Sequence, residues 1–282
     1  MKPKGDVFER IKTEPLAGKR RQVAKYILDN YVEASFLTAA ELAERVRVSE
    51  PTVIRLAYDL GFQGYPQLKD ALQEEVQAQL TTVQRLRRSR KQVQKQALAI
   101  QSLIAEMSNL DSLVHAVDVR ELKRIAKRLA TADKIIVVGY KMSSVLAEYL
   151  HMALKKSVDN TVVVTQATGL FQEELMFAGS DSVVVGISFP RYTRSVVEDF
   201  RQARQRGIRT VAITDSELSP MFEHADHCLL APCKSVSYID AFGAAIALLC
   251  AIATEVSIAT GESLLERLAC VEELWKENEL YF

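Results

Sequence analysis

The sequence predicts two folds in one chain: an all-helical amino-terminal domain, joined by a long helix to a doubly wound α/β/α domain with a five-stranded parallel sheet. Three observations predict it. Short helical patterns separated by tight turns run from Gly18 to about Leu72. A polar stretch without glycine or proline follows, from Gln73 to about Val117. After Asp118, apolar runs alternate with helical patterns. We therefore expect domains at residues 1–75 and 118–282 and a helical linker at 76–117.

Composition and charge indicate a soluble protein with a basic amino-terminal part. The chain has 282 residues, of which 48% are hydrophobic and 26% charged, and its net charge is zero. Residues 1–95 contain 18 Lys and Arg against 12 Asp and Glu, a balance of +6, so the remainder carries −6. Such asymmetry is expected when a nucleic-acid-binding segment is joined to another domain.

The sequence also predicts a cytoplasmic protein without a membrane partner, a cofactor or a metal. The start, MKPKGDVFERIK, lacks the apolar core of a signal peptide. The longest apolar run, AFGAAIALLCAIA, is too short to span a bilayer and predicts a buried helix. No zinc pattern is completed around the four cysteines, which are expected to be buried reduced thiols: Cys228, Cys233, Cys250 and Cys270.

In the carboxyl-terminal region, continuous β-branched runs predict strands that are buried on both faces. They are KIIVVG (134–139), TVVVT (161–165), SVVVGIS (182–188), TVAIT (210–214) and CLLAP (228–232). Helical patterns separate them: SSVLAEYLHMALKK, LFQEELMFA and RSVVEDFRQARQRG. This alternation predicts a parallel sheet with right-handed crossovers, followed by an apolar helix after Asp240 and another at 262–277.

The linker is predicted to be a helix that buries one apolar stripe. Apolar residues recur in it at intervals of three and four, at Val93, Ala97, Ile100, Ile104 and Met107. The strongly basic run RLRRSRKQVQK, from Arg85 to Lys95, is expected to be an exposed connector.

The segment FLTAAELAERVRVSEPTVIRLAYDLGFQGYPQLK predicts two short helices joined by a tight turn. Thr38 and Glu41 form a capping box at the start of the first helix. Ser49 is expected to cap the second helix, Pro51 is tolerated early in it, and Gly61 ends it. This is the helix–turn–helix arrangement, whose second helix presents its outer face to the major groove of DNA.

The helical period divides the second helix into a core face and a DNA face. Apolar residues at i, i+3, i+4 and i+7 face the core: Val53, Leu56, Ala57 and Leu60. The residues expected at the DNA are Ser49, Glu50, Pro51, Thr52, Arg55 and Tyr58. Arg55 is the best candidate for a contact with guanine or phosphate. From the basic group of an earlier helix, some side chains are expected to reach backbone phosphates: Lys19, Arg20 and Arg21. The alternative is an ordinary bundle of capped helices.

The stretch VSEPTVIRLAYDLGFQGYPQLK resembles the winged helix–turn–helix signature of the RpiR-type bacterial transcriptional regulators. In that family a Ser-x-x-Thr-Val-x-Arg helix is followed by Leu-Gly-Phe and a Gly-aromatic-Pro turn. The matching positions are Ser49, Thr52, Val53, Arg55, Leu60, Gly61, Phe62, Gly64, Tyr65 and Pro66. The second half resembles the sugar isomerase (SIS) domain that those regulators carry, so the resemblance covers nearly the whole chain.

The resemblance implies a site for a sugar phosphate at two strand ends. Ser143 matches the family serine at the start of the first crossover helix, with Ser144 beside it; the alternative is that Ser143 only caps this helix. The family pattern Ser-x-Ser-Gly-x-Thr falls on Ser188 to Thr193 and retains its first Ser and its Thr. Pro190 replaces the second Ser and Arg191 replaces the Gly, which removes a hydroxyl and adds a cation that suits carboxylate or phosphate. The alternative for Arg191 is a structural role.

Two further groups complete the list of candidate residues. Ser235 is expected at the rim of the pocket, and Asp240 is expected to cap the apolar helix that follows. If the chain were an isomerase, its available acid–base groups would be His151, Glu173 and Glu174. The simpler interpretation is that His151 is packed in the core and that the two glutamates are solvated.

The sequence therefore predicts a ligand-responsive transcription regulator rather than an enzyme. Its expected partners are double-stranded operator DNA, a small acidic metabolite such as a sugar phosphate or sugar acid, and further copies of the chain in a homodimer or homotetramer. Two alternatives stay open. One is a phosphosugar isomerase with an accessory DNA-binding domain, and the other is a constitutive DNA-binding protein that uses the SIS fold only for assembly.

Overall fold

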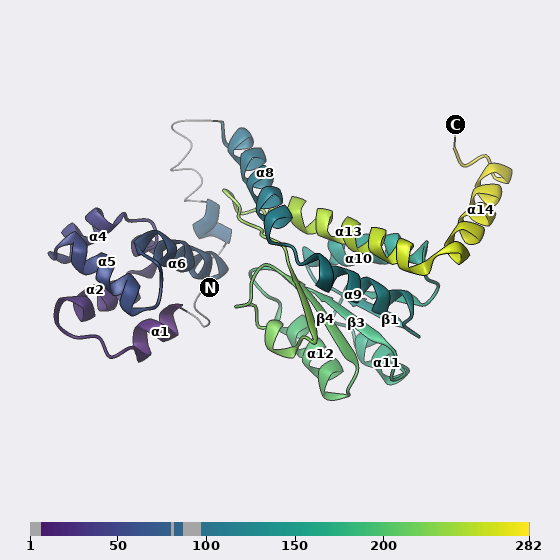
Figure 1. Ribbon diagram of the computed structural model, residues 1–282, viewed down its shortest axis with the longest axis horizontal. Helices are drawn as coiled ribbons and strands as arrows, with labels where there is room; N and C mark the ends of the chain where they lie inside the picture. Colours follow the sequence, from purple (N-terminus) through teal and green to yellow (C-terminus); the bar gives the residue numbers. More distant parts are fainter. Residues whose placement is uncertain (1–6, 80–81, 87–96, 282) are drawn as a thin grey trace. The chain divides into compact units, whose positions relative to one another are not determined.

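The structure, a computed structural model, describes residues 7–79, 82–86 and 97–281. They belong to two compact units, Met1–Arg85 and Leu86–Phe282 (Figure 1). Val93 and most of the basic run that begins at Arg85 lie outside the described residues.

The first unit packs short helices around one apolar core. Its helices are α1 (Val7–Thr13), α2 (Gly18–Asp29), α3 (Tyr31–Ala34), α4 (Ala39–Val46), α5 (Glu50–Asp59) and α6 (Tyr65–Gln79). The four apolar residues predicted to face the core are completely buried: Val53, Leu56, Ala57 and Leu60. This unit contains only helices in the residues that the structure describes, which confirms the all-helical amino-terminal domain that the sequence predicts.

The helix ends in this unit follow the predictions with one exception. The Thr38 hydroxyl accepts a hydrogen bond from the Glu41 N–H and the Glu41 carboxylate accepts one from the Thr38 N–H, which confirms the capping box. Gly61 ends α5 with a φ of 79°, as predicted. Ser49 occupies the N-cap position, but its hydroxyl bonds the Thr52 hydroxyl at 2.9 Å and makes no bond to a helix N–H. The predicted side-chain cap is therefore wrong.

The second unit is built on five parallel strands. They are β1 (Ile135–Val138), β2 (Thr161–Val164), β3 (Val183–Ile187), β4 (Arg209–Thr214) and β5 (His227–Leu230). Their order in the sheet is β2-β1-β3-β4-β5. Each predicted apolar run contains one strand, which confirms the fold class.

Eight helical segments accompany these strands among the described residues. They are α8 (Leu98–Ala116), α9 (Val119–Ala130), α10 (Ser143–Lys155), α11 (Leu170–Met176), α12 (Arg194–Gln205), the 3-10 turn η1 (Phe222–His224), α13 (Gly243–Thr260) and α14 (Glu262–Glu277). Helix α9 was not among the predicted elements. It begins at the cap formed by Asp118, whose carboxylate accepts from the N–H groups of Arg120 and Glu121.

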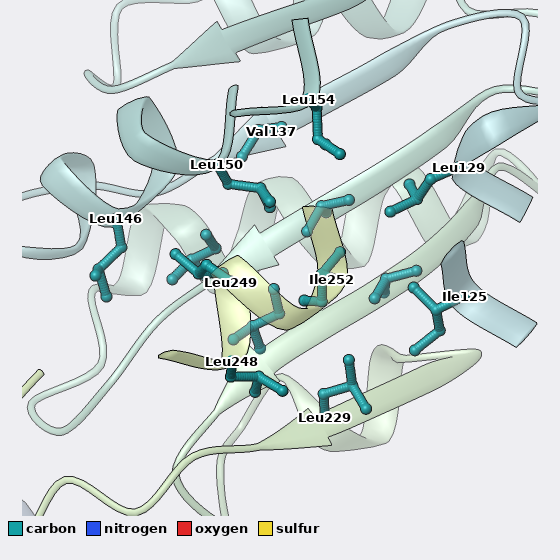
Figure 2. Packing of buried hydrophobic residues seen from close by; sticks show 14 of the residues in the cluster. Ile125, Leu129, Val137, Leu146, Leu150, Leu154, Leu229, Leu248, Leu249 and Ile252 are labelled. Carbon is teal, nitrogen blue, oxygen red and sulfur yellow. The ribbon is translucent and has the colours of Figure 1, made fainter. Parts of the chain in front are cut away.

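Helices cover both faces of the sheet. Successive strand residues point to opposite faces, so each face has apolar side chains that a helix must bury. On one face, Val137 and Leu229 pack with residues of α9, α10 and α13 (Figure 2). On the other face, Ile136 and Val184 pack with α11 and α12. The glycine of β3 allows the second contact, since a Cβ at Gly186 would lie 2.6 Å from the Phe200 ring.

Helix α13 is the apolar helix that the sequence predicts, and its inner face is buried. The buried residues are Ala244, Ala245, Leu248, Leu249, Ile252 and Val256, and three of them are labelled in Figure 2. The helix has 18 residues and is long and apolar enough to cross a membrane by length and composition alone. The prediction of a buried apolar helix is confirmed on this face.

Helix α8 contradicts the predicted burial of the linker stripe. Ile100, Ile104 and Met107 are exposed, and the buried residues of this helix are Asn109 and Leu113. The pattern was assigned to the wrong face because apolar residues occupy most of the helix circumference. The cysteine prediction also needs correction, because Cys250 and Cys270 are exposed and Cys228 and Cys233 are only partly buried.

Polar side chains of α8 hold the segment after β5. The Asn109 amide donates to the Lys234 carbonyl at 2.9 Å, and its oxygen accepts from the Lys234 N–H at 3.1 Å. The Glu106 carboxylate accepts from the Gly243 N–H, the first residue of α13, at 3.0 Å. Asp240 therefore does not cap α13 as predicted, because a carboxylate from α8 fills that place.

A buried carboxylate joins three elements of the other face. Asp199 of α12 accepts hydrogen bonds from the Tyr140 hydroxyl, in the turn after β1, and from the Gln172 amide of α11, the latter at 2.7 Å. Burial raises the pKa of Asp199, although the bonds from Tyr140 and Gln172 oppose the shift. Burial and the neighbouring Asp199 also raise the pKa of Tyr140, which stays a protonated donor. The network fixes the turn after β1 against α12.

We expect Asp199→Ala to lower the free energy of unfolding by about 2 kcal/mol, because it leaves the buried Tyr140 hydroxyl without its acceptor and removes the acceptor of the Gln172 amide. The matched control is Glu198→Ala, one residue earlier on the exposed face of α12, where the carboxylate pairs with Arg201. A surface pair of this kind contributes about 0–1 kcal/mol. Urea unfolding of both variants measures the difference. Equal losses would show that the buried network contributes nothing.

Candidate functional site

Helix α5 presents the predicted DNA face to solvent. Ser49, Glu50, Pro51, Arg55 and Tyr58 are exposed. Thr52 is partly buried and bonded to the Ser49 hydroxyl. The preceding turn is compact because Arg47 takes a left-handed conformation with a φ of 59°. The arrangement is a helix–turn–helix formed by α4 and α5, with an exposed guanidinium in the middle of its second helix.

The basic group at the start of α2 divides into two kinds of side chain. Lys19 and Arg21 are exposed. Arg20 forms an ion pair with Asp59 at the end of α5. This pair ties α2 to the second helix of the motif, which gives Arg20 a structural contact within the unit. Sequence periodicity could not reveal it, because the two residues are 39 positions apart.

The ends of β1 and β3 meet at the point where the strand order reverses. From β1 the chain runs through α10 on one face to β2, and from β2 it runs through α11 on the other face to β3. The register pairs Val138 with Gly186, so the turns after the two strands begin side by side. Open α/β sheets bind ligands outside the carboxyl ends of their strands at such a switch point. These two turns are therefore the candidate ligand site.

In the first turn, Gly139 lets α10 approach the strand closely. A Cβ at this position would lie 2.7 Å from the Ser143 carbonyl oxygen. Ser143 is the first residue of α10, it is buried, and it does not cap the helix, so the capping alternative is wrong. The Ser144 hydroxyl donates to the Lys141 carbonyl at 2.6 Å. The N–H groups of Ser143 and Ser144 are bonded to the carbonyls of Tyr140 and Lys141. An anion here would therefore meet the Ser143 hydroxyl and the positive end of the helix dipole.

In the second turn, the two family hydroxyls lie at opposite ends of a short loop. Ser188 is buried and its N–H donates to the Ile213 carbonyl at 3.2 Å. Thr193 is the N-cap residue of α12 by its backbone, and its side chain makes no capping bond. Arg191 is exposed between them, after a cis peptide bond to Pro190. The loop thus places a cation at the surface of the candidate site.

Two contacts that the sequence did not indicate hold this loop. The Tyr192 hydroxyl donates to the Asp215 carboxylate, after β4, at 2.6 Å. Burial, followed by the charge of Asp215, raises the pKa of Tyr192, so the phenol stays protonated and continues to donate. The Phe189 ring packs on Phe242, just before α13, with ring centroids 5.3 Å apart. Single-sequence reasoning has no signal for partners that are so distant along the chain.

Ser235 lies in the segment between β5 and α13, and its hydroxyl serves that segment. It donates to the Ile239 carbonyl at 2.6 Å and accepts from the Ser237 N–H at 3.1 Å. The contact of Phe242 with Phe189 brings the end of this segment to the β3 turn. The structure therefore assigns Ser235 a role in shaping the loop, and its expected contact with a ligand stays a prediction.

The groups considered for acid–base chemistry do not gather at these turns. His151 lies in the third turn of α10, eight residues after Ser143, about 12 Å along the helix. Burial lowers its pKa, which favours the neutral imidazole. Glu174 forms an ion pair with Lys134 at 2.5 Å, at the opposite end of β1. Within the residues that the structure describes, no group of His, Cys, Asp and Glu side chains is arranged to hold a metal ion.

Comparisons with known proteins agree with both halves of the chain. Residues 10–79 match the family model for the helix-turn-helix domain, rpiR family, and residues 128–254 match the SIS domain. HexR of Pseudomonas aeruginosa, an HTH-type transcriptional regulator, is 29% identical over 80% of this chain and 79% of its own length. HexR of Escherichia coli is 27% identical over 75% of this chain and 73% of its own length.

Two solved structures show the same fold. The sugar isomerase domain of an RpiR transcription factor from Sphaerobacter thermophilus has a TM-score of 0.60 and 27% identity, covering 63% of this chain and 99% of that one. The Vibrio vulnificus NanR protein complexed with ManNAc-6P has a TM-score of 0.60 and 22% identity, covering 96% of this chain and 98% of that one. With its helix–turn–helix and its five-stranded parallel sheet, this chain belongs to the RpiR family of HTH-type transcriptional regulators that carry a SIS domain.

Proposed function

We propose that the SIS domain of this regulator senses a phosphorylated sugar or a related acidic metabolite, and that the bound metabolite changes the affinity of the chain for its operator. The observation that carries the proposal is the pair of turns at the switch point, with Ser143 on one and Ser188, Arg191 and Thr193 on the other. The NanR protein, of the same fold, is complexed with a sugar phosphate, ManNAc-6P, which supports this ligand class.

Arg191 favours an acidic ligand. Where the family pattern has a glycine, this loop has an exposed guanidinium, which can meet a phosphate or a carboxylate through two parallel hydrogen bonds. Such a charged hydrogen bond contributes about 1.5–3 kcal/mol when one partner is ionised. We therefore assign Arg191 to the charged group of the ligand and the serine and threonine hydroxyls to its polar contacts.

The operator contacts follow from the exposed face of α5. In this proposal, Arg55 reaches a guanine edge or a phosphate in the major groove, while Glu50, Pro51 and the turn residue Ser49 approach the bases at the start of the helix. Lys19 and Arg21 contact the phosphate backbone. A two-fold symmetric dimer would read two half-sites about 34 Å apart, or a multiple of that spacing.

Each of the two other functions lacks support at the site. An isomerase needs an acid–base group against the sugar, and His151 lies two helical turns from Ser143. A constitutive DNA-binding protein would need no ligand turn, yet the buried Ser143 and Ser188 lie at the switch point. The sensing function therefore accounts for more of the structure.

We expect Arg55→Ala to weaken operator binding by roughly 10- to 100-fold, because one guanidinium contact to a base or phosphate is worth about 1–3 kcal/mol. Operator fragments are first selected from random DNA with the unaltered chain, and affinity is measured by mobility shift at one fixed salt concentration. Arg209→Ala, at an exposed arginine of the second unit, is the charge-matched control and keeps its affinity. An Arg55→Ala variant that binds as tightly as the unaltered chain contradicts the assignment.

We expect ManNAc-6P, or another compound in a panel of sugar phosphates and sugar acids, to raise the melting temperature of the chain. Ligand at 100 times its Kd adds about 2.7 kcal/mol to the free energy of unfolding. Arg191→Ala is expected to raise Kd by roughly tenfold or more, because a charged contact is lost. Arg206→Ala, at the far end of α12, is the control and leaves Kd unchanged.

A compound that raises the melting temperature, and whose Kd depends on Arg191, is then added to the operator mobility-shift assay. Its effect on operator affinity measures the coupling, expected to be about 1–3 kcal/mol. If no compound shifts the melting temperature while DNA binding is intact, the constitutive function is correct. If the chain converts a phosphosugar, and His151→Ala abolishes the conversion, the isomerase function is correct.

A further inference from the structure

The ion pair between Arg20 and Asp59 joins the basic start of α2 to the end of the helix that faces the DNA. Arg20 is the third residue of α2, whose first turn has no acidic residue. The positive end of the helix dipole disfavours a cation at this place. The carboxylate of Asp59, the last residue of α5, supplies the missing negative charge. The two side chains are 41% and 28% exposed, so the pair is partly open to solvent.

Asp59 borders the face of α5 that carries Arg55. The two residues are four apart in the helix, which places their Cβ atoms about 5–6 Å from each other and their side chains about 40° apart around the helix axis. Arg55 is exposed, and Asp59 is partly buried and paired with Arg20. The carboxylate therefore lies one helical turn from the guanidinium that we assign to the operator.

An unpaired carboxylate at this position would oppose operator binding in two ways. It would attract the Arg55 guanidinium, because opposite charges four residues apart on a helix pair with each other. It would also repel the phosphates of a bound operator, since charges closer than the Debye length, about 8 Å at physiological ionic strength, act on each other. Both effects require an uncompensated negative charge on Asp59. A cation that pairs with Asp59 cancels them.

We propose that Arg20 is a positioning residue for operator recognition, and that it acts through Asp59 rather than through a phosphate contact of its own. Its guanidinium neutralises the carboxylate beside Arg55 and leaves Arg55 free for the DNA. The sequence groups Arg20 with Lys19 and Arg21 as phosphate contacts, and the ion pair separates it from these two exposed residues. The inference rests on the proposed function, because it requires that Arg55 contacts the operator.

The test compares three variants with the unaltered full-length chain on a selected operator fragment: Arg20→Gln, Asp59→Asn and the double variant. Arg20→Gln keeps the stem of the side chain but leaves the carboxylate without its cation, so operator affinity is expected to fall roughly three- to tenfold. Asp59→Asn is expected to bind at least as tightly as the unaltered chain. Adding Asp59→Asn to Arg20→Gln is expected to restore the lost affinity. A partly exposed ion pair contributes little to folding, so all three variants are expected to keep their melting temperature.

Salt dependence separates this role from a direct phosphate contact. The ion pair has no net charge, so the double variant is expected to keep the slope of log affinity against log salt that the unaltered chain has. Loss of a phosphate contact lowers that slope by about 1. The matched control is Arg21→Gln, at the neighbouring exposed arginine. Its loss of affinity is expected to persist when Asp59→Asn is added.

Three results would overturn the inference. An Arg20→Gln variant of unaltered affinity would show that the ion pair does not affect recognition. A double variant that stays weak and has a lower salt slope would show that Arg20 contacts a phosphate directly. An Asp59→Asn variant as weak as Arg20→Gln would show that the pair only holds α2 on α5.

These results differ from those expected if the proposed function fails. A chain that binds no DNA, or whose Arg55→Ala variant binds as tightly as the unaltered chain, overturns the proposed operator contact and this inference with it. A chain whose binding depends on Arg55 but not on the charge of Asp59 keeps the proposed function and overturns the inference alone.

Discussion

The adjacency of β1 and β3 is the constraint on which the second unit depends. Because a right-handed crossover leaves β1 on one face and another enters β3 from the opposite face, the turns at their carboxyl ends form a topological switch point. Gly139 and Gly186 permit the close helix contacts on either side. The hydrogen bond from Tyr140 to Asp199 then fixes the first turn against the helix that follows the second turn. The base of the candidate site is thus fixed by backbone packing and a buried hydrogen bond.

Direct contacts connect helix α8 to this site. Its Asn109 holds the backbone of Lys234, and the same segment ends at Phe242, which packs on Phe189 in the β3 turn. The contacts therefore run without interruption from the candidate ligand turn to α8. Coupling between two sites requires an element that both can bias, and α8 precedes α9 and the sheet in the chain.

Sequence patterns predicted the sheet well because its strands are short, β-branched and separated by clear helical periods. The same logic found the buried face of α5, whose four apolar residues have one helical spacing. It failed where a polar side chain has a distant partner. Asn109 bonds a residue 125 positions away and Asp199 one 59 positions away, and no local pattern encodes such pairs. Ser49 and Asp240 are residue types suited to capping, and both were predicted to cap a helix. The Ser49 hydroxyl instead bonds the Thr52 hydroxyl, and the N–H of Gly243 at the start of α13 donates to Glu106 of α8 rather than to Asp240.

The linker shows why apolar periodicity alone does not identify the buried face. The predicted stripe reaches α8 at Ile100, Ile104 and Met107, which are apolar and exposed. The contact of α8 with the rest of its unit uses an amide, a carboxylate and Leu113 instead.

The chemistry of the loop from Ser188 to Thr193 favours the proposed sensing function over catalysis. Replacing a family serine and glycine by Pro190 and Arg191 removes a hydroxyl donor and a permissive backbone position. The guanidinium that takes their place has hydrogen-bond donors and no acceptor, so it can bind an acidic group but is not suited to serve as the general base of an isomerase. A site that gains a permanent cation and has its neutral histidine two helical turns away is suited to retaining a ligand unchanged. Retention without turnover is the property that a metabolite sensor requires.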